Sequence, residues 1–347
     1  MVTIRDVARK AGVSRSTVSL VLNNNPLVKD ETRRHVLEVI KELNYVPNNN
    51  ARGLSSKTNN SLGLVVFVDK TRSPDQFSYD FNQSTGMCSY SISNGIMLGL
   101  AETDYGVITE RFCSVDEPDE LPRVVKNRRV DGVFLVGNPY SPKLMKKMQE
   151  TGIPMVIAGV DSYEDEIDSV YADPGVGTVM ELEHLLETGH KKICLVNSPK
   201  NYHSSYTRVK AVSEYVGKNG IDFDFEWVIF CKSNRGESGY ETFKEFWEAG
   251  NRPDGVITAN GQIALGVMRY LYENNIRVPE DVSIVAYEDS SLCGYATPGL
   301  TVVNIRKEAL GEQAAKCLLQ RMQNPEKKVE HIVIEPYMVE RQSVKPR

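Results

Sequence analysis

The sequence lacks the features that would place the chain in a membrane or carry it out of the cell. No apolar run approaches the roughly 18 residues that a membrane-spanning helix needs. The N-terminal segment has no uninterrupted apolar stretch of the kind found in signal peptides, because Arg5, Asp6, Arg9 and Lys10 break it. These two absences predict a cytoplasmic protein with no membrane partner.

Short motifs for metal binding and for common enzyme chemistry are also absent. The six cysteines are scattered with no C-x-x-C pair, which favours reduced structural thiols over disulfides or zinc. The five histidines form no H-E-x-x-H, and no Walker or dinucleotide-binding fingerprint occurs. The run from Gly236 to Gly239 misses the G-x-S-x-G spacing of a hydrolase by one residue. We therefore expect no enzyme activity and no resident metal or cofactor.

The composition is ordinary, but the charge is unevenly divided. The 347 residues are enough for two or three domains, and 41% apolar with 25% charged residues is typical of a globular protein. Residues 1–60 hold ten basic and five acidic residues, a net charge of +5, whereas the remainder holds 31 and 41, a net charge of −10. A small basic segment on a large acidic one indicates nucleic-acid binding by one end. Ordinary scatter of surface charge is the alternative.

The first 22 residues have the spacing of two short helices. Apolar residues of the first helix recur one turn apart, at Ile4, Val7, Ala8 and Ala11. Gly12 follows where a helix ends, and Ser14 can cap a second helix with apolar positions at Val18, Val21 and Leu22. Two short helices joined by a tight turn with glycine predict a helix-turn-helix, whose second helix enters the DNA major groove. Any small helical hairpin is the alternative.

A third helix and a polar linker follow. Asp30 is the expected N-cap of this helix, whose apolar stripe consists of Val36, Val39, Ile40 and Leu43. The three helices form a headpiece over residues 1–46. Residues 47–60 contain Pro47 and a run of asparagines, and they are too polar to bury themselves. We expect a linker there, with Leu54 as its one conspicuous apolar residue.

From residue 61 the pattern changes to alternating strands and helices. The near-continuous apolar run 61–68 is typical of a parallel strand covered on both faces. Further strands are expected at 106–112, 130–136, 153–159, 191–197, 226–231, 253–259 and 281–287. Helices are expected around 90–103, 117–128, 141–151, 175–188, 205–218, 237–248 and 261–274. This alternation predicts an α/β fold with parallel sheets, and so many strands fit two sheets better than one.

Several sequence blocks occur in a specific order. They are TIRDVARKAGVSRSTVSLVLN, ETRRHVLEVIKELNYVPN and ARGL, followed by VDGVFLVG, RPDGVITAN, VPEDVSIVAYED and TPGLTVV. With these blocks the chain resembles the LacI–GalR family of bacterial transcription regulators. The resemblance implies a helix-turn-helix headpiece (1–46), a hinge helix (47–60) and a two-lobed core (61–347) like a periplasmic sugar-binding protein, each lobe a parallel α/β sandwich.

The resemblance also implies how the core is divided. The N-lobe would comprise about 61–163 and 292–323, and the C-lobe about 164–291 and 324–347. The chain would cross between the lobes near 160–168, 288–293 and 322–328. A small-molecule effector would bind between the two lobes.

The resemblance assigns DNA contacts to named residues of the headpiece. Arg15, Ser16 and Leu20 match the base-reading side chains: Arg15 suits guanine, Ser16 suits several bases, and Leu20 suits a thymine methyl group. Packing within the headpiece is the alternative for Leu20. Phosphate contacts, which position without specifying sequence, are expected from Thr3, Ser14, Thr17, Ser19 and Asn23.

In the family, the segment matching residues 48–55 folds into a short helix only on the operator, beside the same helix of a dimer mate. The residue matching Leu54 is wedged into a base step of the minor groove and kinks the DNA. Further DNA contacts are expected from Asn48 and Ala51 of this segment. A scattered surface leucine is the alternative for Leu54. Because one headpiece is a small interface, we expect a homodimer on a near-palindromic double-stranded operator.

Four residues, Asp173, Arg208, Asn260 and Glu288, match effector-contacting or cleft positions of the family. Polar groups converging in a largely apolar cleft fix the orientation of a ligand. A surface helix charge is the alternative for Arg208. A helix N-cap, which is compatible with lining the cleft, is the alternative for Asp173. Gly159 stands where many sugar-responsive relatives have an aspartate. Because paired carboxylates commonly hold sugar hydroxyls, this loss weakens the case for an ordinary monosaccharide.

The sequence thus predicts a dimeric, sequence-specific DNA-binding regulator: a repressor of a carbohydrate-utilisation operon, controlled by a sugar or sugar derivative. A phosphoprotein co-repressor, used by one branch of the family, is an open alternative for its control. Phe77, Tyr79 and Phe81 either close on the ligand or belong to the dimer surface. A solute-binding module without a regulatory role and an enzyme built on the α/β core are competing classes. The headpiece argues against the first, and the missing catalytic constellation argues against the second.

Overall fold

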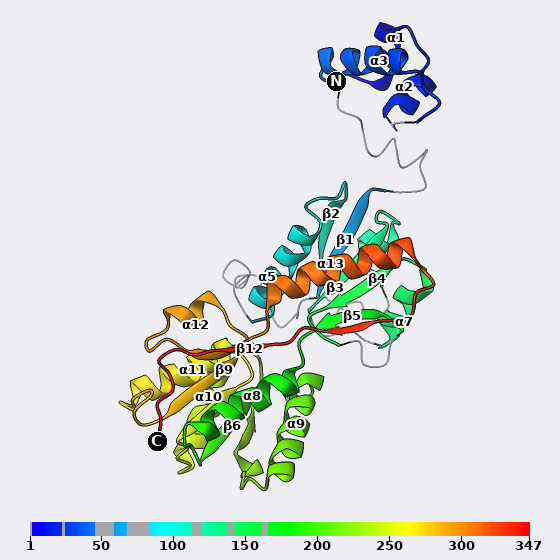
Figure 1. Cartoon of the computed structure of the whole chain (residues 1–347). Helices are drawn as coiled ribbons and strands as arrows, with labels where there is room; N and C mark the ends of the chain where they lie inside the picture. The colour runs from blue at the N-terminus through cyan, green and yellow to red at the C-terminus, as the bar shows by residue number, and fades with distance from the viewer. Residues whose placement is uncertain are drawn as a thin grey trace. The chain divides into compact units, whose positions relative to one another are not determined.

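A computed structural model describes residues 2–22, 25–45, 59–67, 84–112, 120–137, 142–161 and 166–347. The chain forms two compact units, Met1–Asn60 and Ser61–Arg347 (Figure 1). Asn23, most of the expected hinge segment with Asn48, Ala51 and Leu54, and the three aromatic residues expected after the first strand lie outside the described residues. In the described part of the chain, no helix has both the length and the apolar character that crossing a membrane requires.

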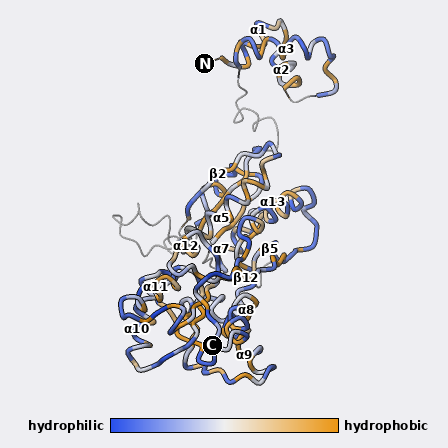
Figure 2. The backbone as a smooth tube through the Cα atoms, turned by 60° about the vertical axis from the view of Figure 1, so that its left-hand side comes forward, coloured by the Kyte–Doolittle hydropathy of each residue, from blue (hydrophilic) through white to orange (hydrophobic). Residues whose placement is uncertain are grey.

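In the described residues of the first unit, three helices form a bundle: α1 (Ile4–Ala11), α2 (Arg15–Leu22) and α3 (Asp30–Glu42). Their apolar stripes meet in one small core, and Figure 2 shows the matching alternation of hydrophobic and hydrophilic residues along these helices. Gly12 ends α1 in the left-handed conformation, with φ +64°. The Ser14 hydroxyl accepts a hydrogen bond of 3.1 Å from the amide of Thr17, as an N-cap does. Asp30 is the first residue of α3 and not its cap, so that prediction is wrong by one position.

In its described residues the second unit contains two sheets, as the sequence predicted, and each of them has six strands. The N-lobe sheet has the order β11-β5-β4-β3-β1-β2 and is parallel throughout. Its strands are β1 (Ser61–Phe67), β2 (Gly106–Phe112), β3 (Gly132–Val136), β4 (Met155–Ala158), β5 (Asp168–Tyr171) and β11 (His331–Val333). The C-lobe sheet has the order β12-β10-β9-β8-β6-β7, in which β12 is antiparallel to β10. Its strands are β6 (Ile193–Asn197), β7 (Val228–Phe230), β8 (Gly255–Thr258), β9 (Ser283–Tyr287), β10 (Thr301–Asn304) and β12 (Tyr337–Val339).

Helices cover both faces of each sheet, which explains why the strands are apolar on both sides. The N-lobe helices are α5 (Ser84–Gly99), α6 (Arg123–Lys126), α7 (Pro142–Glu150) and α13 (Lys307–Gln323). The C-lobe helices are α8 (Pro174–Glu187), α9 (His203–Asn219), α10 (Gly236–Glu248), α11 (Gly261–Glu273), α12 (Ser291–Tyr295) and the 3-10 turn η3 (Phe225–Trp227). In β1, Leu62 and Leu64 pack toward α5 and α13, while Val65 and Phe67 pack toward α6 and α7.

The chain crosses between the lobes at places that differ from those predicted. It leaves the N-lobe sheet after β5 at residue 172, returns between β10 and α13 at 305–306, and crosses again between β11 and β12 at 334–336. The N-lobe is therefore 61–172 with 306–333, and the C-lobe is 173–305 with 334–347. The crossings expected near 160–168, 288–293 and 322–328 are wrong. Each of these places is followed by a further strand of the lobe that precedes it, namely β5, β10 and β11.

Helices α5 and α13 of the N-lobe pack backbone against backbone, and they run side by side in Figure 1. A Cβ on Gly95 would lie 2.1 Å from the carbonyl oxygen of Glu308, and one on Gly311 would lie 2.1 Å from that of Ile92. Neither position has room for a side chain. This glycine contact was not foreseen, because the sequence had not indicated a helix at 307–323.

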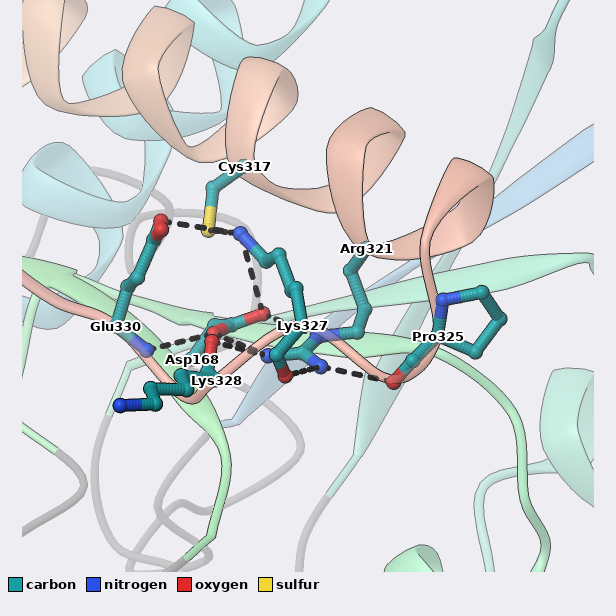
Figure 3. Close-up of polar contacts among 7 residues, drawn as sticks. All are labelled: Asp168, Cys317, Arg321, Pro325, Lys327, Lys328 and Glu330. Carbon is teal, nitrogen blue, oxygen red and sulfur yellow. Dashed lines mark hydrogen bonds and ion pairs between the residues drawn. The ribbon is translucent and has the colours of Figure 1, made fainter.

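A buried carboxylate ties the end of α13 to the sheet (Figure 3). Asp168, the first residue of β5, has a side chain with no exposed area. It accepts hydrogen bonds of 2.8 Å from both Nε and Nη2 of Arg321 and one of 2.9 Å from the amide of Glu330. Arg321 also donates to the carbonyls of Pro325 and Lys328 in the loop that leads to β11. Burial raises the pKa of Asp168, but the donors from Arg321 and Glu330 hold it below its usual value.

We expect Asp168→Asn to destabilise the core by about 3–5 kcal/mol, because it leaves the Arg321 guanidinium without its buried partner. The pKa of Asp168 is lower in the folded chain than its unfolded value of about 3.9. The stabilisation is therefore complete above that pH and is lost as the pH falls through the lowered value. Thermal unfolding from pH 7 to pH 3 checks both points.

The matched control is Asp281→Asn. Asp281 accepts an equally short pair of hydrogen bonds from Arg277, but this ion pair is exposed on the surface. Its removal should change the unfolding midpoint little. Equal effects of the two substitutions would contradict the structural importance given to Asp168.

Candidate functional site

A cavity of about 150 Å³ lies between the two lobes. Its walls are formed by the residues at the carboxyl ends of β3, β4 and β5 in the N-lobe and of β6, β8 and β9 in the C-lobe. Helix α5 adds Cys88, Ser89 and Ile92, and α9 adds Arg208. The carboxyl edge of a parallel sheet is where α/β folds bind ligands, and here two such edges face one cavity.

The structure brings three of the four predicted effector residues to this cavity. Arg208, Asn260 and Glu288 all line it. Asp173 does not. Its side chain accepts hydrogen bonds from the amides of Gly175, at 2.7 Å, and Val176, at 3.3 Å, and so caps α8. In the structure, Asp173 is therefore the N-cap of α8.

Arg208 is a buried cation with an exposed fraction of only 4%, so it is not a surface helix charge. Its Nη2 donates to the carbonyl of Ala259 at 3.1 Å, and its guanidinium carbon lies 5.0 Å from the centroid of the Tyr287 ring. Glu181 of α8 is fully buried, and this burial raises its pKa well above the usual value, against the lowering effect of the Arg208 charge. A ligand at Arg208 thus meets a guanidinium held in one place by its surroundings.

Both ends of the Asn260 side-chain amide make hydrogen bonds within the C-lobe. Its Oδ1 accepts from the amide of Ile263 at 2.8 Å and caps α11, while its Nδ2 donates to the carbonyl of Asn234 at 3.3 Å. Asn234 also lines the cavity. The amide of Asn260 is therefore fixed before any ligand arrives.

Glu288 is joined to the opposite lobe. Its Oε1 lies 3.1 Å from Nζ of Lys307, the first residue of α13. Lys307 Nζ also donates to the carbonyl of Asp289 at 2.6 Å. Burial lowers the pKa of Lys307, but the Glu288 carboxylate outweighs this and raises it above its usual value, so the ammonium stays charged. The backbone of Glu288 has φ +74°, a conformation that non-glycine residues rarely adopt.

Sequence reasoning missed three residues at or beside the cavity. Lys307, the partner of the cavity-lining Glu288, was not predicted, because no helix was expected at its position. Asp161 and Tyr171 line the cavity from the N-lobe. Burial and the neighbouring carboxylates of Asp161 and Asp173 raise the pKa of Tyr171 to about 12. Asp161 stands only two residues beyond Gly159, where a carboxylate had been sought, so the sequence did contain a signal for it.

On the headpiece, α2 presents an exposed polar face. Arg15 and Ser16 are exposed, and Leu20, one turn further on, is 38% exposed. Val18 and Val21 point into the core from the other side of the helix. Because Leu20 lies outside this core, packing within the headpiece does not account for it.

Three of the expected phosphate-contacting residues, Thr3, Ser14 and Thr17, lie at the starts of helices. The Ser14 hydroxyl lies 2.7 Å from that of Ser16 and 2.9 Å from that of Thr17. Thr3 donates to the Asp6 carboxylate through its amide, at 3.0 Å, and its hydroxyl, at 2.7 Å. Ser19 is half-buried. Amides and hydroxyls at helix N-termini are suited to phosphate oxygens.

Comparisons with known proteins agree with this architecture. Residues 3–48 match the model of the family "Bacterial regulatory proteins, lacI family", and residues 182–344 match a "Periplasmic binding protein-like domain". The chain is 31% identical over 351 residues to the HTH-type transcriptional repressor PurR of Mannheimia succiniciproducens, covering 99% of each protein.

Two solved structures show the same fold over nearly the whole chain. The lac repressor dimer bound to operator and the anti-inducer ONPF is similar with a TM-score of 0.81 and 26% identity, covering 99% of both chains. The complex of the transcriptional regulator CelR with cellobiose has a TM-score of 0.70 and 26% identity, covering 99% of this chain and 100% of that one. These relatives are regulators and not enzymes. The chain therefore belongs to the lacI family of bacterial regulatory proteins and is a DNA-binding transcriptional regulator.

Proposed function

We propose that this regulator is a homodimeric, cytoplasmic repressor of a carbohydrate-utilisation operon, released or recruited by a sugar or sugar derivative bound between its core lobes. The observation that carries the proposal is the inter-lobe cavity lined by Arg208, Asn260 and Glu288. A charged and hydrogen-bonding cavity at two strand-end edges is suited to a small polar ligand. Such a ligand touches both lobes, so it senses their relative position.

DNA recognition would use the exposed face of α2 in the major groove. The Arg15 guanidinium suits the two acceptors of guanine, Ser16 suits several bases, and Leu20 suits a thymine methyl group. Contacts with the phosphates would come from Thr3, Ser14, Thr17, Ser19 and Asn23. The hinge residues Asn48, Ala51 and Leu54 would enter the minor groove, with Leu54 wedged into a base step.

The dimer would form through an apolar face of the N-lobe. On α5, Tyr90, Met97 and Leu98 are 60%, 41% and 55% exposed, and Ile108 on the edge strand β2 is 37% exposed. Clustered exposed apolar side chains mark interaction surfaces. A second copy of the chain meets this face in a two-fold arrangement, which matches the two half-sites of a palindromic operator.

Effector control would act through the angle between the lobes. The three crossings allow the lobes to rotate, and the Lys307–Glu288 ion pair at 3.1 Å spans them beside the cavity. A ligand shifts this equilibrium only to the extent that it binds one lobe arrangement more tightly than the other. The change would reach the DNA as an altered spacing of the two hinge segments.

The proposal is tested by binding to the DNA upstream of the gene for this chain, at several salt concentrations and with a panel of sugars. We expect tight binding with a steep negative salt dependence, because phosphate contacts release counterions. One sugar should change the affinity. Tight binding that no sugar alters would contradict carbohydrate control, and failure to bind at any salt would contradict the assignment of this DNA as the operator.

A sharper test changes the recognition helix. Arg15→Ala should weaken operator binding by about 1–3 kcal/mol and relax the preference at one base pair, since it removes a base contact. Arg34→Ala, which removes the same charge from an exposed position on α3, is the control. Binding measured across single-base variants of the operator separates the two. An equal loss of affinity for all operator variants in Arg15→Ala would instead indicate that Arg15 contacts the phosphates.

The dimer face has its own test. Met97→Glu should shift the chain from dimer to monomer in sedimentation velocity and lower operator affinity, because the carboxylate would be buried between two apolar surfaces. Tyr206 of α9 is 63% exposed, so Tyr206→Glu is the matched control and this variant should stay dimeric. A dimeric Met97→Glu variant would place the interface elsewhere.

A further inference from the structure

Asp161 contributes a carboxylate to the inter-lobe cavity from the N-lobe. It follows β4, lines the cavity, and has a side chain that is 19% exposed. Gly159, two residues earlier, also lines the cavity and has no side chain to offer. The carboxylate that the sequence lacks at position 159 is therefore present in the same cavity from a neighbouring position.

Two strands of the N-lobe sheet hold this carboxylate in place. The hydroxyl of Ser169, a fully buried residue of β5, donates to Oδ1 of Asp161 at 3.1 Å. Nδ1 of His331, on β11, lies 2.9 Å from the same hydroxyl oxygen and 3.2 Å from Oδ1. Since the hydroxyl gives its hydrogen to Asp161 and a carboxylate only accepts, the Nδ1 atom of His331 carries a hydrogen. Ser169 and His331 are direct partners in the register of β5 and β11.

The C-lobe offers a second carboxylate to the same cavity. Glu288 is 19% exposed, and its Oε1 is held by Lys307. The remaining polar lining combines the Arg208 guanidinium with hydroxyls and amides, including Ser89, Ser198, Tyr202, Ser204 and Asn234. Carboxylates accept strong, charge-assisted hydrogen bonds from hydroxyl groups, and hydroxyls and amides can both donate and accept. This set of groups matches a ligand that carries many hydroxyls.

We propose that Asp161 is the ligand-binding carboxylate of the N-lobe, that Ser169 and His331 position it, and that the ligand is a hydroxyl-rich molecule such as a monosaccharide. This inference rests on the proposed function in taking the inter-lobe cavity as the effector site and a sugar or sugar derivative as its ligand; the new element is the role of Asp161, Ser169 and His331. Because Asp161 is oriented before the ligand arrives, little ordering is needed on binding. Asp161 and Glu288 then hold hydroxyls from opposite lobes, and the ligand bridges the lobes through both.

The test uses the full-length chain and a defined panel of probes: D-glucose, D-galactose, D-ribose, D-fructose, cellobiose, myo-inositol, D-glucuronate and D-galacturonate. Adenine and guanine, which carry no hydroxyl groups, complete the panel as contrasts. Thermal unfolding finds the probes that bind, and isothermal titration gives their affinities. We expect at least one hydroxyl-rich probe to bind. Comparison of the neutral sugars with the two uronates shows whether the ligand is neutral or carries a carboxylate.

Asp161→Asn should weaken binding of that probe about tenfold or more, because it replaces a charged acceptor with a neutral amide. Its unfolding midpoint without probe should stay close to that of the unchanged chain. Asp104→Asn removes the same charge from an exposed position of the same lobe and should bind the probe normally. Equal affinity of the Asp161→Asn variant would overturn the role of Asp161 and leave the proposed function untouched.

His331 is tested as a positioning residue by a pair of substitutions. His331→Asn keeps an N–H group near the place of Nδ1 and should retain most of the affinity for the probe, whereas His331→Leu should lower that affinity several-fold. A purely structural role would instead lower the unfolding midpoint of His331→Leu and leave the probe affinity unchanged. Binding of adenine or guanine in place of every sugar, or of no probe at all, would overturn the ligand class. Operator binding, measured separately, tests the proposed DNA-binding function independently of the ligand.

Discussion

The buried contact between Asp168 and Arg321 fixes the strands from which the cleft is made. Asp168 begins β5, and the loop that Arg321 holds leads into β11, so one carboxylate sets the pairing of the last two strands of the N-lobe sheet. Ser169 and Tyr171 follow directly on β5, and His331 begins β11. A slip of one residue would turn each of these side chains to the opposite face. The position of Tyr171 at the cavity, and those of Ser169 and His331 beside Asp161, therefore depend on this contact.

Helix α13 connects this contact to the other lobe. Arg321 lies near its C-terminal end, in the interior of the N-lobe, while Lys307 at its N-terminal end pairs with Glu288 of the C-lobe. The helix is therefore fixed at one end and meets the second lobe at the other. Lys307 has an oppositely charged partner only while the two lobes stay close at this point, which links the ionic interactions of the cleft to the arrangement of the lobes.

Much of this architecture was visible in the sequence, and what was missed has physical causes. The caps and stripes of the headpiece and the apolar strands of both sheets could be predicted, because local spacing decides them. Helix α13 was missed, since it packs closely through small residues such as Gly311 and Ala314 and has no strong apolar stripe. The lobe crossings were misplaced, because a short link between lobes has no distinctive composition. Asp161 was overlooked, because a carboxylate was sought at position 159 and the structure places one in the cavity from position 161.

The close approach of α5 and α13 has a mechanical consequence. Because α5 and α13 pack backbone against backbone at Gly95 and Gly311, we expect the two helices to move together. Helix α5 bears Ser89, which faces the cavity, and Leu98, on the proposed dimer face, about 13 Å apart at the rise of an α-helix. A ligand that tilts α5 at the cavity would therefore also move the proposed dimer face at the other end of the helix. The glycine contact thus couples the cavity end of α5 to α13 and to the proposed dimer face.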